Sequence, residues 1–217
     1  IPPISLADGP AGIRISQKIK DDEGELNIPV ETDMVSDVED LQAKKAEKLA
    51  QNMRELSKNG VHVVGRVYCF QDEAASKQNS DLSMEYQNGG RWSDYNSEHW
   101  LDPTNPDVVT YLCDIAQSAV DAGCDEILLD EFTFPLRGHI DRIEFFNEPD
   151  SQAAALLDVM QEIQNTVGDS VAVSLTASDA SELITQSETA AEDGVKLGNV
   201  KKLLTTAHRV YVPVGSD

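Results

Sequence analysis

The stretch that decides the fold is Gly123-Cys124-Asp125-Glu126-Ile127-Leu128-Leu129-Asp130-Glu131-Phe132-Thr133-Phe134-Pro135. We expect a helix to end at Gly123, and a short apolar strand to follow it and to end in the carboxylates of Asp130 and Glu131. In α/β barrels, an acid at the carboxyl end of such a strand lies at the mouth, where the chemistry takes place. The stretch therefore predicts an α/β fold and favours an enzyme.

The same order of a helix followed by a buried strand recurs along the chain. This order is typical of a parallel sheet with crossover helices. Ser36 and Glu39 form a capping box for the first helix, Asn59-Gly60 predicts its end, and Asn105-Pro106 predicts the start of the second. The predicted helices begin at residues 36, 106, 151 and 199, and the strands that follow them span residues 61–70, 127–130, 171–176 and 210–214.

The number of strands limits the choice of fold. A closed eight-stranded barrel usually needs about 250 residues, and about 200 is the lower limit. We identify five or six strands in the 217 residues, including a weak one over residues 25–30. The prediction is therefore one domain over residues 1–217, an α/β TIM-type (β/α) barrel that is incomplete or truncated.

Charge and composition narrow the class of partner. Seventeen basic against 39 acidic residues give a net charge of −22, which disfavours nucleic acid and anionic membranes and suits neutral or cationic ligands. No run of eighteen apolar residues predicts a membrane span. No signal peptide is visible, although the chain opens at Ile1-Pro2-Pro3 and a removed leader stays open. The sequence indicates no oligomeric state.

The cysteines and histidines show no metal-ligand spacing. Cys69, Cys113 and Cys124 are predicted to be buried thiols, and the alternative is a disulfide between Cys113 and Cys124 in an oxidising compartment. His62, at the start of a strand, is expected in the core or at the rim. Without a glycine-rich phosphate loop or a Ser–His elbow, we predict neither a metal site nor a cofactor.

The acidic residues suggest a chemistry. Glycoside hydrolysis generally needs two carboxyl groups beside the scissile bond, one as proton donor and one as nucleophile or base. Asp130 is the first candidate. Because successive strand residues point to opposite faces, we expect only one of Asp130 and Glu131 to face the mouth. The candidates for the second carboxylate are Asp72, Glu73, Asp102, Glu131 and Asp179.

Other polar and aromatic residues are candidates for binding a substrate. Arg66, inside an apolar strand, is expected either to orient Asp130 or to form a structural ion pair below the mouth. Trp92 and Trp100 both fall in the connection of about 35 residues after residue 70, and connections of this length are often functional. Exposed indoles there would stack on sugar rings, whereas buried ones would pin the connection to the body. Asp179 follows the strand over residues 171–176.

Three stretches resemble a bacterial family that is assigned to the glycoside hydrolases and is related to the α-amylase-like barrels. They are Val64-Gly65-Arg66-Val67-Tyr68-Cys69-Phe70-Gln71-Asp72, Trp100-Leu101-Asp102-Pro103 and residues 125–135. The resemblance implies a (β/α) barrel, a carbohydrate substrate and Asp130 as a key acid at the mouth. It also implies an extracellular or envelope-associated protein. Arg66, Asp72, Asp102 and Glu126 carry over as motif positions without assigned roles.

The chain departs from the family pattern at two positions. The family usually has an aspartate where this chain has Ile15-Ser16-Gln17-Lys18, and another where Thr176 stands at the end of a strand. If the second aspartate is the missing carboxylate, the chain is a weak or inactive enzyme.

Three hypotheses follow. The first is a glycosidase that cleaves O-glycosidic bonds in a polysaccharide or glycan. The second is a carbohydrate-binding or cell-envelope module on a degenerate barrel. The third is a metal-dependent lyase or aldolase, in which Asp130 with Glu126 or Asp102 would provide oxygen ligands.

Overall fold

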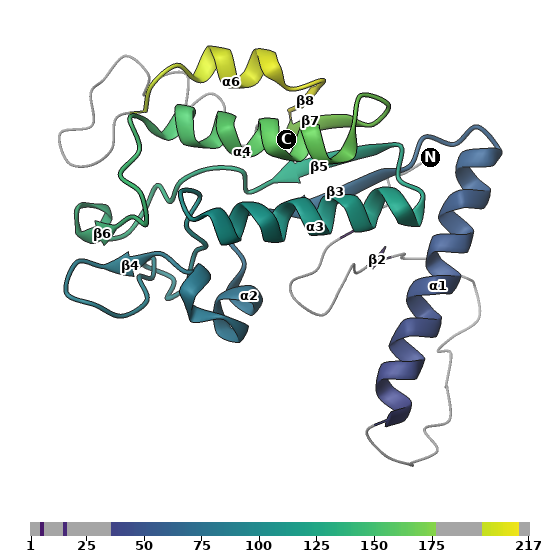
Figure 1. Cartoon of the computed structure of the whole chain (residues 1–217), viewed down its shortest axis with the longest axis horizontal. Helices are drawn as coiled ribbons and strands as arrows, with labels where there is room; N and C mark the ends of the chain where they lie inside the picture. The colour runs from purple at the N-terminus through teal and green to yellow at the C-terminus, as the bar shows by residue number, and fades with distance from the viewer. Residues whose placement is uncertain (1–4, 7–14, 17–35, 177–196, 213–217) are drawn as a thin grey trace, which may run out of the picture.

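The computed structural model describes residues 5–6, 15–16, 36–176 and 197–212 (Figure 1). Within these residues the helices are α1 (Ser36–Lys58), α2 (Glu73–Gln78), α3 (Pro106–Ala122), α4 (Gln152–Val167) and α6 (Val200–Thr206), with 3-10 helices η1 (Ser80–Leu82) and η2 (Ile140–Arg142). The strands are β1 (Ser5–Leu6), β2 (Ile15–Ser16), β3 (Val64–Tyr68), β4 (Glu85–Tyr86), β5 (Glu126–Asp130), β6 (Ile143–Glu144), β7 (Ala172–Thr176) and β8 (Val210–Tyr211).

A four-stranded sheet in the order β3-β5-β7-β8 forms the centre of the described residues, and all its neighbouring pairs are parallel. This confirms the predicted parallel α/β arrangement. The described residues form an open sheet and not a closed barrel, so a barrel is not established for this chain. The strand predicted over residues 25–30 lies outside the described residues.

The ends of α3 follow from its sequence. Asn105 accepts a hydrogen bond from the backbone N–H of Asp107 at 2.9 Å, and Pro106 occupies the first turn. The helix ends at Gly123, which has a φ of +109°. A Cβ at this position would lie 2.8 Å from Cγ of Arg54 in α1. Glycine is therefore required at residue 123 both by the left-handed backbone and by the approach of α1.

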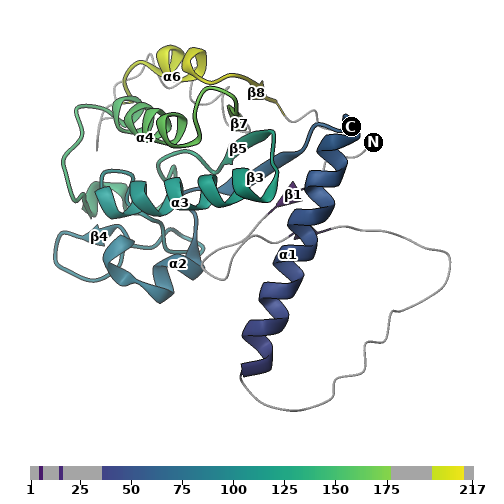
Figure 2. The ribbon, with the colours of Figure 1, turned by 45° about the vertical axis from the view of Figure 1, so that its right-hand side comes forward.

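Helix α1 contacts the rest of the described structure near its carboxyl end. Figure 2 shows that this end lies beside the end of α3, whereas the amino end of α1 extends away from the sheet. Arg54 donates a hydrogen bond to the backbone carbonyl of Asp121 at 3.2 Å. After α1, Gly60 adopts a φ of +79°, as the Asn59-Gly60 pair predicts.

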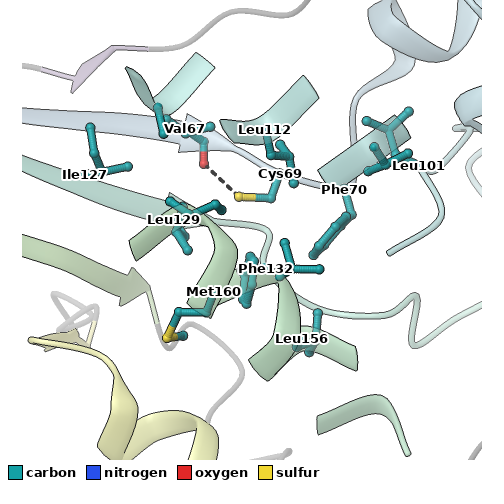
Figure 3. Packing of buried hydrophobic residues seen from close by; sticks show 14 of the residues in the cluster. Val67, Cys69, Phe70, Leu101, Leu112, Ile127, Leu129, Phe132, Leu156 and Met160 are labelled. Carbon is teal, nitrogen blue, oxygen red and sulfur yellow. Dashed lines mark hydrogen bonds between the residues drawn. The ribbon is translucent and has the colours of Figure 1, made fainter. Parts of the chain in front are cut away.

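The apolar core lies between the sheet and the helices α3 and α4, which lie side by side (Figure 1). Ile127 and Leu129 of β5 are fully buried, and Figure 3 shows them packed among residues of α3 and α4 such as Leu112 and Met160. Because side chains alternate along a strand, Glu126, Leu128 and Asp130 face the opposite side of the sheet. That opposite face carries the polar residues of the candidate site.

The long connection after β3 is a packed structure. It contains α2, η1 and β4, and β4 pairs in antiparallel register with β6, from the connection after β5. Trp92 is fully buried and donates its indole N–H to the carbonyl of His139 at 3.0 Å. A Cβ on Gly138 would lie 2.5 Å from the Trp92 ring. Trp92 therefore fastens the two connections together.

Candidate functional site

Asp130 ends β5 at the carboxyl edge of the parallel sheet, as predicted. Its side chain is almost fully buried, with 1% of the residue exposed. Arg66 of the neighbouring strand β3 donates hydrogen bonds from Nε and Nη2 to the same oxygen, Oδ2, and the Nε bond measures 2.7 Å. The structure therefore brings together the two residues that the sequence suggested as partners.

Tyr68 completes this group. It lies opposite Asp130 in the register of β3 and β5, and its ring centroid lies 4.7 Å from Cζ of Arg66. At this distance a guanidinium is attracted to the face of an aromatic ring. Arg66 is thus held between a ring and a carboxylate, while 35% of its side chain remains exposed. The ion pair is consequently ordered and still reachable from solvent.

Asp72 acts as a helix cap. Its Oδ1 accepts hydrogen bonds from the backbone N–H groups of Ala74 and Ala75 at 3.1 and 2.9 Å, and its Oδ2 accepts one from the Tyr111 hydroxyl at 2.9 Å. Asp72 is 7% exposed. These contacts give it a structural role at the start of α2, and they do not favour the catalytic role predicted for it.

Glu73, at the start of α2, holds the later part of the long connection through His99. It accepts hydrogen bonds from the backbone N–H and the ring of His99 at 2.7 and 2.9 Å, and it pairs with Lys77 at 3.2 Å. Burial on its own raises the pKa of the Glu73 carboxyl, but the bonds from His99 and Lys77 outweigh it and lower the pKa to about 2. An acid that is ionised at neutral pH is a poor proton donor.

Asp102 joins the long connection to the segment after β6. Its Oδ1 accepts from the N–H and the hydroxyl of Thr104 at 2.8 and 2.7 Å, and its Oδ2 accepts from the N–H of Phe146 at 2.7 Å. Burial raises the pKa of the Asp102 carboxyl, against the lowering effect of these bonds. Asp102 also lines a cavity of about 500 Å³ with the carboxylates of Asp81, Glu85, Asp107 and Glu144.

Glu131 begins the turn after β5 with a left-handed φ of +48°. Its backbone carbonyl accepts a hydrogen bond from the N–H of Phe70 at 3.4 Å. Near this turn, Cys69 is completely buried, and burial and the charges of Asp130, Glu131 and Asp72 raise the pKa of its thiol well above the ordinary value. The fold therefore brings the carboxylates of Asp130, Glu131 and Asp72 close to one buried thiol whose pKa is raised.

All three cysteines are free thiols. Cys69 and Cys124 are buried, as predicted, and Cys113 is half-buried. The alternative prediction of a Cys113–Cys124 disulfide is wrong.

The two tryptophans that were predicted to bind a substrate are covered by the rest of the protein. Trp92 and Trp100 are buried, with 0% and 6% exposed, so neither ring offers a face on which a sugar could stack. Both fit the alternative role of pinning the long connection to the core. Strand β7 ends at Thr176, whose buried hydroxyl has no hydrogen-bond partner among the residues that the structure describes. Asp179 lies outside the described residues.

Glu126, at the amino end of β5, is the centre of a polar cluster whose partners sequence reasoning missed. It is fully buried and accepts hydrogen bonds from His62 at 2.7 Å, Ser174 at 2.5 Å and Tyr211 at 3.1 Å. It also pairs with Arg209. Burial alone raises the pKa of the Glu126 carboxyl, but these partners lower it overall.

The Glu126 cluster joins the strands of the sheet instead of forming a nucleophile. Glu126 lies between Ser174 and His62, so the imidazole makes no direct contact with the hydroxyl, as a serine nucleophile would require. The only sequence signal for this cluster was the acid at the start of a strand, a position where carboxylates usually serve stability.

In the part of the chain that the structure describes, no three or more His, Cys, Asp or Glu side chains are grouped so that they could hold a metal ion. Among the helices described, none combines the length and apolarity needed to cross a membrane.

A buried carboxylate, paired with arginine at the carboxyl edge of a parallel sheet, is an arrangement found in enzymes of the α/β class. Comparison with known protein families identifies one family for this chain. Residues 15–200 match the family described as "Putative glycosyl hydrolase domain", and the chain belongs to this family. No curated protein matches the chain.

Solved structures show similarity over part of the chain. A hypothetical protein from Ruminiclostridium thermocellum shares 29% sequence identity with this chain, with a TM-score of 0.52. The match covers 58% of this chain and 64% of the chain of that protein. A family GH13_31 enzyme shares 14% identity over 76% of this chain and 38% of its own, with a TM-score of 0.48.

An alpha-galactosidase from Thermus thermophilus shares 16% identity over 58% of this chain and 26% of its own, with a TM-score of 0.43. The last two are too distant to define the fold or activity of this chain. The match spans less than two thirds of the length of each of the three structures.

Proposed function

We propose that the chain is a glycoside hydrolase domain that cleaves O-glycosidic bonds in a polysaccharide or glycan, with Asp130 as a catalytic carboxylate. The observation that carries this proposal is the Arg66–Asp130 pair at the carboxyl edge of β3 and β5. Membership of the glycosyl hydrolase family supports the reaction class. In this proposal the four parallel strands are an arc of a (β/α) barrel, and their polar face is its interior.

Asp130 would act as the nucleophile or the general base. Arg66 donates twice to one oxygen, Oδ2, and so fixes the orientation of the carboxylate. A carboxylate that is oriented by an ion pair suits attack on an anomeric carbon or activation of water, and not proton donation. Tyr68 would support this geometry by holding the guanidinium in place.

The proton donor would come from Asp102, Glu131 or Asp179. Asp102 has the raised pKa that a general acid needs, and it lines a cavity whose lining does not include Asp130. Its two oxygens are held by Thr104 and Phe146, so it would have to exchange one of these bonds for the leaving oxygen. Asp72 and Glu73 are less suitable, because structural hydrogen bonds occupy both.

Replacing Asp130 with asparagine tests the proposal. Asp130→Asn keeps the size of the side chain, and we expect it to lower the release of reducing sugar at least a hundredfold across a panel of polysaccharides and nitrophenyl glycosides. The matched control is Asp114→Asn, the same change at an exposed site on α3. Melting curves of both variants separate lost chemistry from lost folding. Retained turnover in a folded Asp130→Asn protein refutes the role of Asp130.

A carbohydrate-binding module is the second candidate. It is favoured because Asp72 and Asp102 hold structural hydrogen bonds and because β7 ends in Thr176 and not in an acid. A glycan array beside the hydrolysis assay separates the two functions, since a module binds a glycan without turning it over. An extracellular or envelope location stays a prediction from the family resemblance.

A further inference from the structure

A groove between α3 and α4 forms a second surface feature, independent of the proposed function. It encloses about 330 Å³ near the amino ends of the two helices. Its apolar lining consists of Pro103, Pro106, Val109, Pro149, Ala154, Ala155 and Val159. Neither Asp130 nor Arg66 lines it. The groove is therefore separate from the Arg66–Asp130 pair, although Thr104 in its lining also holds the carboxylate of Asp102.

The groove is held in shape before any partner binds. Asn147 donates from its backbone N–H to the Thr104 hydroxyl and from its side chain to the Thr104 carbonyl, each at 3.1 Å. These bonds join the connection before α3 to the one before α4. The prolines in the lining restrict both connections further. A preformed groove costs a ligand little in ordering the protein.

The charge around the groove has one sign. Its rim carries Asp150, Asp158 and Glu162, and none of its lining residues is basic. In the described part of the chain, none of these three carboxylates takes part in an ion pair. Asp158 and Glu162 lie four residues apart on one face of α4, where like charges repel.

The two helices that form the groove do not compensate this charge. Neither α3 nor α4 contains a lysine or an arginine. Their charged residues are Asp107, Asp114, Asp121, Asp158 and Glu162. A cationic partner would relieve this uncompensated repulsion, which an anionic or neutral partner would leave in place.

We propose that the α3–α4 groove docks a basic amphipathic segment of a partner protein. An aliphatic side chain of the segment would fill the apolar floor, and its lysines or arginines would pair with Asp150, Asp158 and Glu162. The floor has no aromatic ring, which makes a sugar a poorer occupant. The chain's own residues 177–196 carry five acids and one lysine, so their charge does not match the rim.

The test uses a fluorescein-labelled synthetic peptide with leucines at helical spacing and lysines between them. Fluorescence anisotropy measures its binding to the full 217-residue chain at low salt and at 0.3 M salt. Two further peptides serve as controls, one with glutamate in place of lysine and one with the same composition but no apolar face.

Three variants locate the binding. Asp158→Asn with Glu162→Gln removes two rim charges from exposed positions, and Ala154→Trp fills the groove without changing the charge. Asp114→Asn with Asp121→Asn removes two charges outside the lining and is the matched control. Melting curves confirm that each variant is folded.

We expect the rim variant and the filled groove each to weaken binding at least tenfold, and the control pair to change it less than twofold. Three results overturn the proposal. Equal loss in both charge variants, or no effect of Ala154→Trp, would show attraction to the overall charge of the protein. The third is no preference for the amphipathic lysine peptide over either control peptide.

Discussion

Replacing Arg66 with leucine tests the ion pair on which the candidate site is built. The change leaves the Asp130 carboxylate, only 1% exposed, without its guanidinium. Removing one partner of a buried pair costs about 3–5 kcal/mol in the free energy of unfolding. Because 35% of the Arg66 side chain is exposed, water can partly replace it. We therefore expect a loss of about 2–3 kcal/mol.

The double variant distinguishes this mechanism from lost packing. Arg66→Leu with Asp130→Leu removes both charges, and we expect it to recover to within about 1 kcal/mol of the wild type. Urea denaturation measures all four proteins of the cycle. Arg142→Leu is the control, since Arg142 is 62% exposed and lies 4.0 Å from Asp141. A cost of less than about 1 kcal/mol for Arg66→Leu, or a double variant no more stable than the single one, would contradict a buried ion pair as the cause.

Two further predictions concern stability. Glu73→Gln should destabilise the protein at neutral pH and make the long connection more sensitive to protease. Because folding lowers the Glu73 pKa from 4.5 to about 2, the contribution of this carboxylate to stability is complete above pH 4.5 and is lost as the pH falls through 2. The free energies of unfolding of wild type and variant should therefore converge at about pH 2. A difference that persists there would contradict this. Gly123→Ala should cost about 1–2 kcal/mol for its left-handed φ of +109° and more for the contact with Arg54. Gly60→Ala, with a φ of +79° and open space around it, should cost only the backbone contribution. Equal losses in urea denaturation would show that the approach of α1 to Gly123 does not affect stability.

The parallel sheet could be predicted because its signals are local. Asn105, Pro106 and Gly123 mark the two ends of α3 within the sequence itself, and the apolar run before Asp130 marks β5. The end of β5 at Asp130 follows from the same run. Closure of a barrel is different, because it depends on strands that the described residues do not form.

The contacts between distant residues could not be predicted from local pattern. Glu126 is bonded by Arg209 and Tyr211, which lie 83 and 85 residues further along the chain. Nothing in their own segment indicates that partner. The two tryptophans illustrate the same limit, because exposure depends on how the connections fold over each other. Trp92 is covered through its contacts with Gly138 and His139.

Chemical rescue by azide tests the role of Asp130 most directly. Asp130→Ala creates space for a small anion where the carboxylate stood. We expect this variant to be inactive and azide to restore its turnover, with a glycosyl azide as the product. Full activity of Asp130→Ala without azide would show that another residue performs the chemistry.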